Sequence, residues 1–129
     1  MIKRSAEGNI VAGLLRSFRY AASGVAYCFR TQRNLKIHAV AAVLAMAAGF
    51  RLGLSGAELG VLALTIAAVL VAEMFNTAVE ALVDIVSPGY HPLAKVAKDV
   101  AAGGVLVTAL VSLVVAYLLF APRILELGR

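Results

Sequence analysis

The sequence predicts an all-α membrane protein, with three transmembrane helices and an N-terminal amphipathic surface helix, in a single domain over residues 1–129. Three observations predict this fold. Of the 129 residues, 62% are hydrophobic, which exceeds the share in ordinary soluble domains. The run Val100–Ala121 holds 22 residues without a charge, and about 20 apolar residues suffice to cross the hydrocarbon layer. Basic residues gather before residue 37 and again between residues 87 and 99, as expected of cytoplasmic segments.

The surface helix is predicted at about residues 9–30, "NIVAGLLRSFRYAASGVAYCFR". Its larger apolar residues recur at spacings of three, four and seven, and its arginines lie off that stripe. This pattern is typical of a helix that lies on a membrane surface. Membrane lipids are therefore expected partners. The net charge of +5 then reflects anionic lipid, and no nucleic acid partner is expected because no aromatic and basic reading surface is present.

The three spans are predicted at about residues 35–52, 57–86 and 93–121. The first is short, since only Ile37–Phe50 is free of charge, and it requires Lys36 and Arg51 to extend their ammonium and guanidinium groups to the two interfaces. No signal peptide is expected, because the basic N-terminal segment has no early apolar core with a cleavage site. The charge distribution predicts a cytoplasmic N-terminus and an external C-terminus.

The connections between the spans have turn signals. Gly53 and Gly56 predict a tight turn after the first span, with Ser55 as a cap for the second. Ser87-Pro88-Gly89 predicts the end of the second span, and Pro92 after His91 can begin the third.

Four polar residues interrupt the second span in the stretch "VLVAEMFNTAVEALVDIV", residues 69–86. At 100° per residue, Glu73, Asn76, Glu80 and Asp84 share one face of a helix. An acid at mid-membrane costs about 2.5–3.5 kcal/mol on insertion scales. This acidic stripe therefore requires a cationic partner, a proton or a metal ion.

Two interpretations of the acidic stripe are open. In the structural one, the acids pair with Lys95 and Lys98 and hold the helices together. In the functional one, carboxylate and carboxamide oxygens bind Mg²⁺, which takes one or two protein carboxylates and completes its shell with water and phosphate oxygens. A carboxylate among apolar groups, as expected for Glu73, is also a stronger base than one in water.

The segment "AKVAKD" places Lys98 beside Asp99 at the start of the third span. A cation near a carboxylate-bound metal suits a polyphosphate, because phosphoryl transfer depends on positioning and neutralising phosphate oxygens. No glycine-rich phosphate-binding motif occurs in the sequence. Any nucleotide site would have to be built from side chains on helices.

The segment "AEMFNTAVEALVD", followed by "YHPLAKVAKDVAAGGVL", resembles the signature of the prokaryotic integral-membrane diacylglycerol kinase family, which includes undecaprenol kinases. The resemblance covers roughly residues 14–120, and the second segment is more similar to the undecaprenol kinase branch. It implies a homotrimer in the bacterial cytoplasmic (inner) membrane, with its active site on the cytoplasmic side. It also implies transfer of the γ-phosphate of ATP, with Mg²⁺, to a lipid alcohol, either undecaprenol or diacylglycerol.

The resemblance also implies roles for individual residues. Glu73 would be the general base, with Asn76 beside it, and Glu80 and Gln32 would bind the metal. The predicted nucleotide-binding residues are Tyr20, Gln32, Glu80, Gly89, Tyr90, His91, Lys98 and Asp99. Gln32 departs from the family pattern, which usually has a glutamate there, and this neutral side chain predicts weaker binding of the metal or of ATP.

Two other functions are compatible with the sequence. A catalytically impaired membrane scaffold of the same fold would account for Gln32. A small proton-coupled transporter would use a membrane glutamate that alternates between protons and cations. Outside the acidic stripe, His38 is interpreted as an interface residue at the head of the first span.

Overall fold

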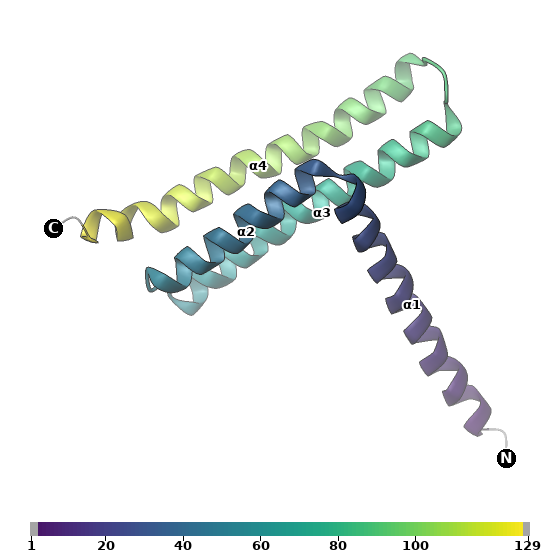
Figure 1. Cartoon of the computed structure of the whole chain (residues 1–129), viewed down its shortest axis with the longest axis horizontal. Coiled ribbons are helices and arrows are strands. Elements are labelled where there is room, and N and C mark those ends of the chain that lie inside the picture. Colours follow the sequence, from purple (N-terminus) through teal and green to yellow (C-terminus); the bar gives the residue numbers. More distant parts are fainter. Residues whose placement is uncertain (1–2, 128–129) are drawn as a thin grey trace. The chain divides into compact units, whose positions relative to one another are not determined.

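The structure is a computed structural model that describes the backbone of residues 3–127 and the side chains of residues 10–127. This part of the chain forms the helices α1 (Lys3–Thr31), α2 (Arg33–Arg51), α3 (Gly56–Val86) and α4 (Pro92–Leu127), labelled in Figure 1. The described residues up to Gln32 form one compact unit, and those from Arg33 onward form another. The predicted helices are therefore present, with bounds that differ by a few residues.

Helix α1 starts at Lys3, six residues before the predicted start at residue 9. The added segment contains Lys, Arg, Ala and Glu, which favour helix formation without any apolar stripe. Ile10, Leu14 and Phe18 are each more than half exposed. Such a row of exposed apolar side chains suits the predicted position on a membrane surface.

A tight turn joins α2 to α3. Gly53 has φ of 68°, in the left-handed region that glycine adopts without strain. The Ser55 hydroxyl accepts the Glu58 N–H at 3.3 Å, and Glu58 Oε2 accepts the Ser55 N–H at 2.6 Å. These two bonds form a capping box, so the predicted cap at Ser55 is confirmed. A Cβ on Gly49 would lie 3.0 Å from Leu54 Cδ1. Because glycine has no Cβ, α2 can end close against this turn.

The connection between α3 and α4 also follows the prediction. Helix α3 ends at Val86 and α4 begins at Pro92, with His91 Nδ1 accepting the N–H of Leu93 at 3.2 Å. At its other end, α4 continues through Pro122 to Leu127, past the predicted end of the third span at about residue 121. Proline removes one backbone hydrogen bond, but membrane helices tolerate this loss where neighbouring groups compensate.

Helix α3 packs against both α2 and α4 (Figure 1). Among the described helices, α3 and α4 are long and apolar enough to cross a membrane, with mean hydropathies of 2.0 and 2.5 in their most apolar windows. Helix α2 has 19 residues, about 28 Å of helix, and is less apolar. A third span at α2 thus stays a prediction. No residue of α4 is buried within this chain, so most of its apolar surface is available to lipid or to other chains.

Candidate active site

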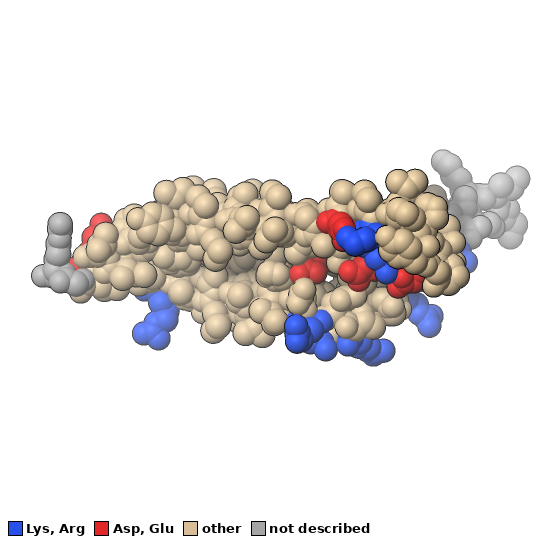
Figure 2. All heavy atoms as spheres, turned by 90° about the horizontal axis from the view of Figure 1, so that it is seen from above, with Lys and Arg blue, Asp and Glu red and all other residues tan. Residues whose placement is uncertain are grey.

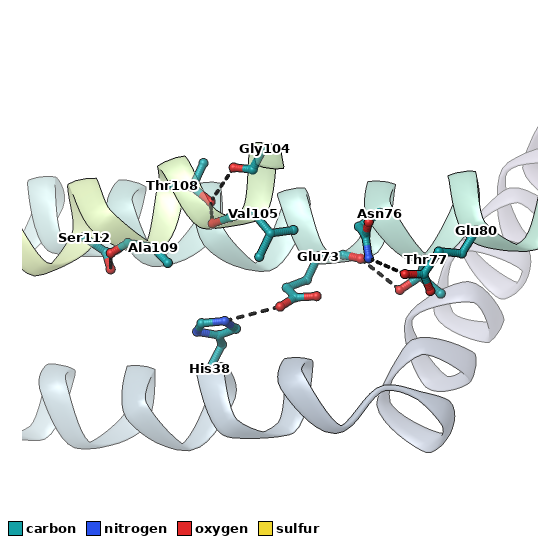
Figure 3. Close-up of polar contacts among 10 residues, drawn as sticks. All are labelled: His38, Glu73, Asn76, Thr77, Glu80, Gly104, Val105, Thr108, Ala109 and Ser112. Carbon is teal, nitrogen blue, oxygen red and sulfur yellow. Dashed lines mark hydrogen bonds and ion pairs between the residues drawn. The ribbon is translucent and has the colours of Figure 1, made fainter. Parts of the chain in front are cut away.

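Glu73 lies buried between α2 and α3. Its residue surface is 3% exposed, and its Oε1 lies 3.3 Å from His38 Nε2 on α2. Figure 3 shows the two side chains pointing toward each other across the gap between the helices. No hydrogen bond reaches the buried Oε1, so the contact with His38 is close but poorly aligned. Burying a carboxylate is costly without a partner, and the polar side chain described in contact with this acid is that of His38.

One turn after Glu73 on α3, the Asn76 side chain is hydrogen-bonded to that of Glu80. The Asn76 amide donates to Glu80 Oε1 at 3.0 Å, while Asn76 Oδ1 is buried without a hydrogen bond. Thr77 is also buried, and its hydroxyl donates to the Glu73 carbonyl at 2.9 Å. The α3 face predicted from residue spacing therefore presents a carboxylate next to an uncommitted carboxamide oxygen (Figure 3).

These oxygens fit part of a magnesium shell. Mg²⁺ prefers oxygen ligands and keeps several water or phosphate oxygens around it. In the side chains described for residues 10–127, no group of three His, Cys, Asp or Glu residues converges. Glu80 and Asn76 could thus supply one side of such a shell, and the remaining ligands would have to come from elsewhere.

Two ion pairs lie at the turn between α3 and α4. Lys98 Nζ lies 2.5 Å from Asp84 Oδ1, and Lys95 Nζ lies 2.5 Å from Asp99 Oδ2. Figure 2 shows acidic and basic side chains beside each other toward this end of α3 and α4. The structural interpretation of the acidic stripe is confirmed for Asp84 alone, because Glu73 meets His38 and Glu80 meets Asn76.

The same turn carries an open recess of about 370 Å³. Five of the residues predicted to bind a nucleotide line it together: Gly89, Tyr90, His91, Lys98 and Asp99. The recess is lined by both polar and apolar groups, and its charged residues are Asp84, Lys95, Lys98 and Asp99. It lies at the C-terminal end of α3. The polar residues Glu73, Asn76 and Glu80 follow one another along α3 toward this end.

An apolar cavity of about 170 Å³ lies on the other side of Glu73. It is partly open and is lined by residues of α2, α3 and α4, including the small residues Ala41, Ala42 and Ala45 of α2. Val69, one turn before Glu73, and His38 also line it. The apolar cavity thus reaches the contact residue of Glu73, His38, while Asn76 and Glu80 continue the polar face of α3 beyond Glu73.

The remaining predicted residues belong to the first unit. Tyr20 is an exposed residue of α1, and Gln32 follows the last residue of that helix, with its N–H donating to the Cys28 carbonyl at 2.8 Å. Their proposed roles stay predictions. His38 is the residue that the sequence interpretation missed. An ionisable residue near the start of a predicted span was the available signal.

Comparison with known proteins identifies the family. A family model described as prokaryotic diacylglycerol kinase matches residues 19–120. A diacylglycerol kinase of Synechocystis sp. is 45% identical over 120 residues, which are 92% of this chain and 69% of the relative. An undecaprenol kinase of Bacillus subtilis is 40% identical over 116 residues, 90% of this chain and 94% of the relative.

One relative is named for diacylglycerol and the other for undecaprenol, so the similarities do not identify the lipid acceptor of this chain. They agree on the type of reaction, which places the chain among membrane lipid kinases and not among transporters. By the extent of the match, the chain belongs to the prokaryotic diacylglycerol kinase family.

Proposed function

We propose that this chain transfers the γ-phosphate of ATP, with Mg²⁺, to the hydroxyl of a membrane lipid at the cytoplasmic interface. The acceptor is undecaprenol or diacylglycerol. The observation that carries this proposal is the position of Glu73, with an apolar cavity on one side and a polar row toward the α3–α4 recess on the other. A lipid alcohol has the same division, between an apolar chain and a reacting hydroxyl.

Glu73 acts as the general base in this proposal. It accepts the proton of the lipid hydroxyl while the hydroxyl oxygen forms a bond to the γ-phosphorus. The bond from the γ-phosphorus to the oxygen that bridges it to the β-phosphate breaks, and ADP leaves. A positioned base contributes about 10²–10⁴-fold to such a step.

The nucleotide occupies the polar side of Glu73. Asp84 is about 16 Å from Glu73 along α3, from the rise of 1.5 Å per residue, so the row joins the base to the recess at the turn. Lys98 would neutralise phosphate oxygens, and Gly89, Tyr90, His91 and Asp99 would surround the rest of the nucleotide. Tyr20 of α1 is proposed to contribute from the first unit.

The metal is proposed to bind to Glu80, with Gln32 as a second oxygen ligand. The uncommitted oxygen of Asn76 supports a cation beside Glu80. When bound, Mg²⁺ would offset the charge of the phosphate oxygens and orient them. Asn76 keeps the Glu80 carboxylate in place through its amide.

The assembly is proposed to be a homotrimer in the bacterial cytoplasmic membrane, with the N-terminus and the active site facing the cytoplasm. The surface of α4 supports association, since no residue of α4 is buried within one chain. Copies of the chain or lipid would cover its apolar side chains.

A phosphate-transfer assay with both lipids tests the proposed reaction. Membranes containing the chain are incubated with γ-labelled ATP and either undecaprenol or diacylglycerol, with and without Mg²⁺. We expect Mg²⁺-dependent labelling of at least one lipid, and the faster acceptor identifies the substrate. Absence of label in both lipids, with the protein present in the membrane, would contradict the proposal and favour the impaired scaffold.

A further inference from the structure

His38 contacts the proposed general base Glu73, and the proposed reaction gives this histidine no role. It projects from α2 toward α3, and its Nε2 is 3.3 Å from Glu73 Oε1 (Figure 3). Oε1 is the glutamate oxygen that is enclosed and accepts no hydrogen bond. The histidine side chain is 28% exposed, and it also lines the apolar cavity. His38 therefore lies between the cavity and the proposed base.

The polar neighbours of Glu73 on its own helix are committed elsewhere. The Thr77 hydroxyl donates to the Glu73 backbone carbonyl, and the Asn76 amide donates to Glu80. Neither of these bonds reaches the Glu73 carboxylate. The polar contact described for the Glu73 carboxylate is therefore the 3.3 Å approach of His38 Nε2 to Oε1.

A general base needs a restraint on its orientation. A glutamate side chain has several rotatable bonds, and it must present one oxygen within hydrogen-bonding distance of the proton that it removes. Displacement of a reacting group by about 1 Å can cost about 100-fold in rate. A donor on the second carboxylate oxygen reduces this freedom before the substrate arrives.

We propose that His38 is a positioning residue for phosphoryl transfer, which holds Glu73 through Oε1 so that Oε2 faces the acceptor hydroxyl. The 3.3 Å contact would shorten into an aligned hydrogen bond when the acceptor is bound, because catalytic hydrogen bonds in unliganded structures are often long. This inference rests on the proposed function, in which Glu73 is the base. It assigns His38 no contact with ATP.

Two substitutions of similar size separate positioning from packing. His38→Gln keeps a side-chain N–H that can reach Glu73, whereas His38→Met fills the same space without a donor. We expect His38→Met to lower kcat by about tenfold or more, with the KM for Mg-ATP unchanged. His38→Gln should recover most of the lost kcat. His38→Leu provides a second apolar filler in case His38→Met does not assemble.

The matched control is Thr108→Val on α4. The Thr108 hydroxyl donates only to carbonyls of its own helix, Gly104 at 3.2 Å and Val105 at 2.9 Å. Its replacement also removes a polar group from a predicted span, and kcat should stay close to that of the unchanged chain. The variants are compared at equal amounts of assembled protein in the membrane.

The outcomes distinguish this inference from the proposed function. Equal kcat values for His38→Gln and the apolar variants, whether high or low, would overturn the positioning role. Full turnover in Glu73→Gln would instead overturn the base assignment and remove the reason for positioning. In the background of Glu73→Gln, His38→Met should add little further loss, since residues that act through one another are non-additive.

Discussion

Lys98 Nζ on α4 lies 2.5 Å from Asp84 Oδ1 on α3, across the turn that joins the two helices. The lysine proposed to meet the nucleotide phosphates is therefore paired with a carboxylate of its own chain. Both side chains are well exposed, at 39% and 66%. Pairs of this kind contribute about 0–1 kcal/mol, so a triphosphate could replace Asp84 at little cost.

This pairing predicts opposite effects of its two members on nucleotide binding. Lys98→Met removes the cation and should raise the KM for Mg-ATP. Asp84→Asn releases the lysine and removes a negative charge near the phosphates, so it should lower that KM, by up to about fivefold from the energy of an exposed pair. Initial rates over a range of Mg-ATP concentrations measure both effects. A higher KM in Asp84→Asn would mean that the aspartate itself supports the nucleotide or its metal.

Gln32→Glu should strengthen magnesium binding. The change places a carboxylate where the family resemblance implies one, and a charged oxygen ligand binds a divalent cation more strongly than a carboxamide. The expected result is a lower Mg²⁺ concentration for half-maximal rate, measured at saturating lipid. Asn34→Asp is the control, because it adds the same charge two residues away. An equal effect of both substitutions would show that the charge acts at a distance and that residue 32 is not a ligand.

Ser55→Ala should destabilise the chain without changing its chemistry. The Ser55 hydroxyl caps α3 through the Glu58 N–H, and loss of such a cap typically costs about 1 kcal/mol. The cap is at the end of α3 opposite the α3–α4 recess, so the KM for Mg-ATP should not change. Thermal unfolding in detergent and steady-state kinetics measure the two properties. If Ser55→Ala shifted the KM for Mg-ATP as much as Lys98→Met does, the cap would affect nucleotide binding as well as stability, and the prediction would be wrong.

The same end of α3 has a second stabilising contact. Arg123 of α4 donates to both carboxylate oxygens of Glu58, at 3.1 and 3.3 Å. The capping box and this ion pair share one glutamate. Glu58→Ala should therefore reduce thermal stability more than Ser55→Ala does, whereas Arg123→Ala should leave the cap intact.

Local signals in the sequence were sufficient for the helix connections. Ser55 lies before an apolar run and Pro92 after a turn, and both mark helix starts because of bonds within a few residues. The shared face of Glu73, Asn76 and Glu80 likewise follows from helical periodicity alone. These features depend on one helix at a time, so spacing along the chain could predict them.

The partner of Glu73 could not be predicted in this way. Which α2 residue meets Glu73 depends on how α2 and α3 are rotated against each other, and packing at Gly49 contributes to that arrangement. His38 was interpreted as an interface residue because it lies at the head of the first predicted span, and an ionisable residue there does not by itself name its partner on α3. Helix α4 also continues past Pro122, beyond the predicted span, and spacing along the chain does not indicate this because local preference disfavours proline within a helix.

The proposed reaction depends on a buried carboxylate, Glu73, that accepts a proton from a lipid alcohol. The most direct test is transfer of labelled phosphate from ATP to the accepting lipid by Glu73→Gln, which keeps the size of the side chain and removes its basicity. We expect the loss of at least about 10²-fold in kcat that removal of a general base produces, with assembly and Mg-ATP binding unchanged. Label transfer at an undiminished rate in this variant would contradict the account.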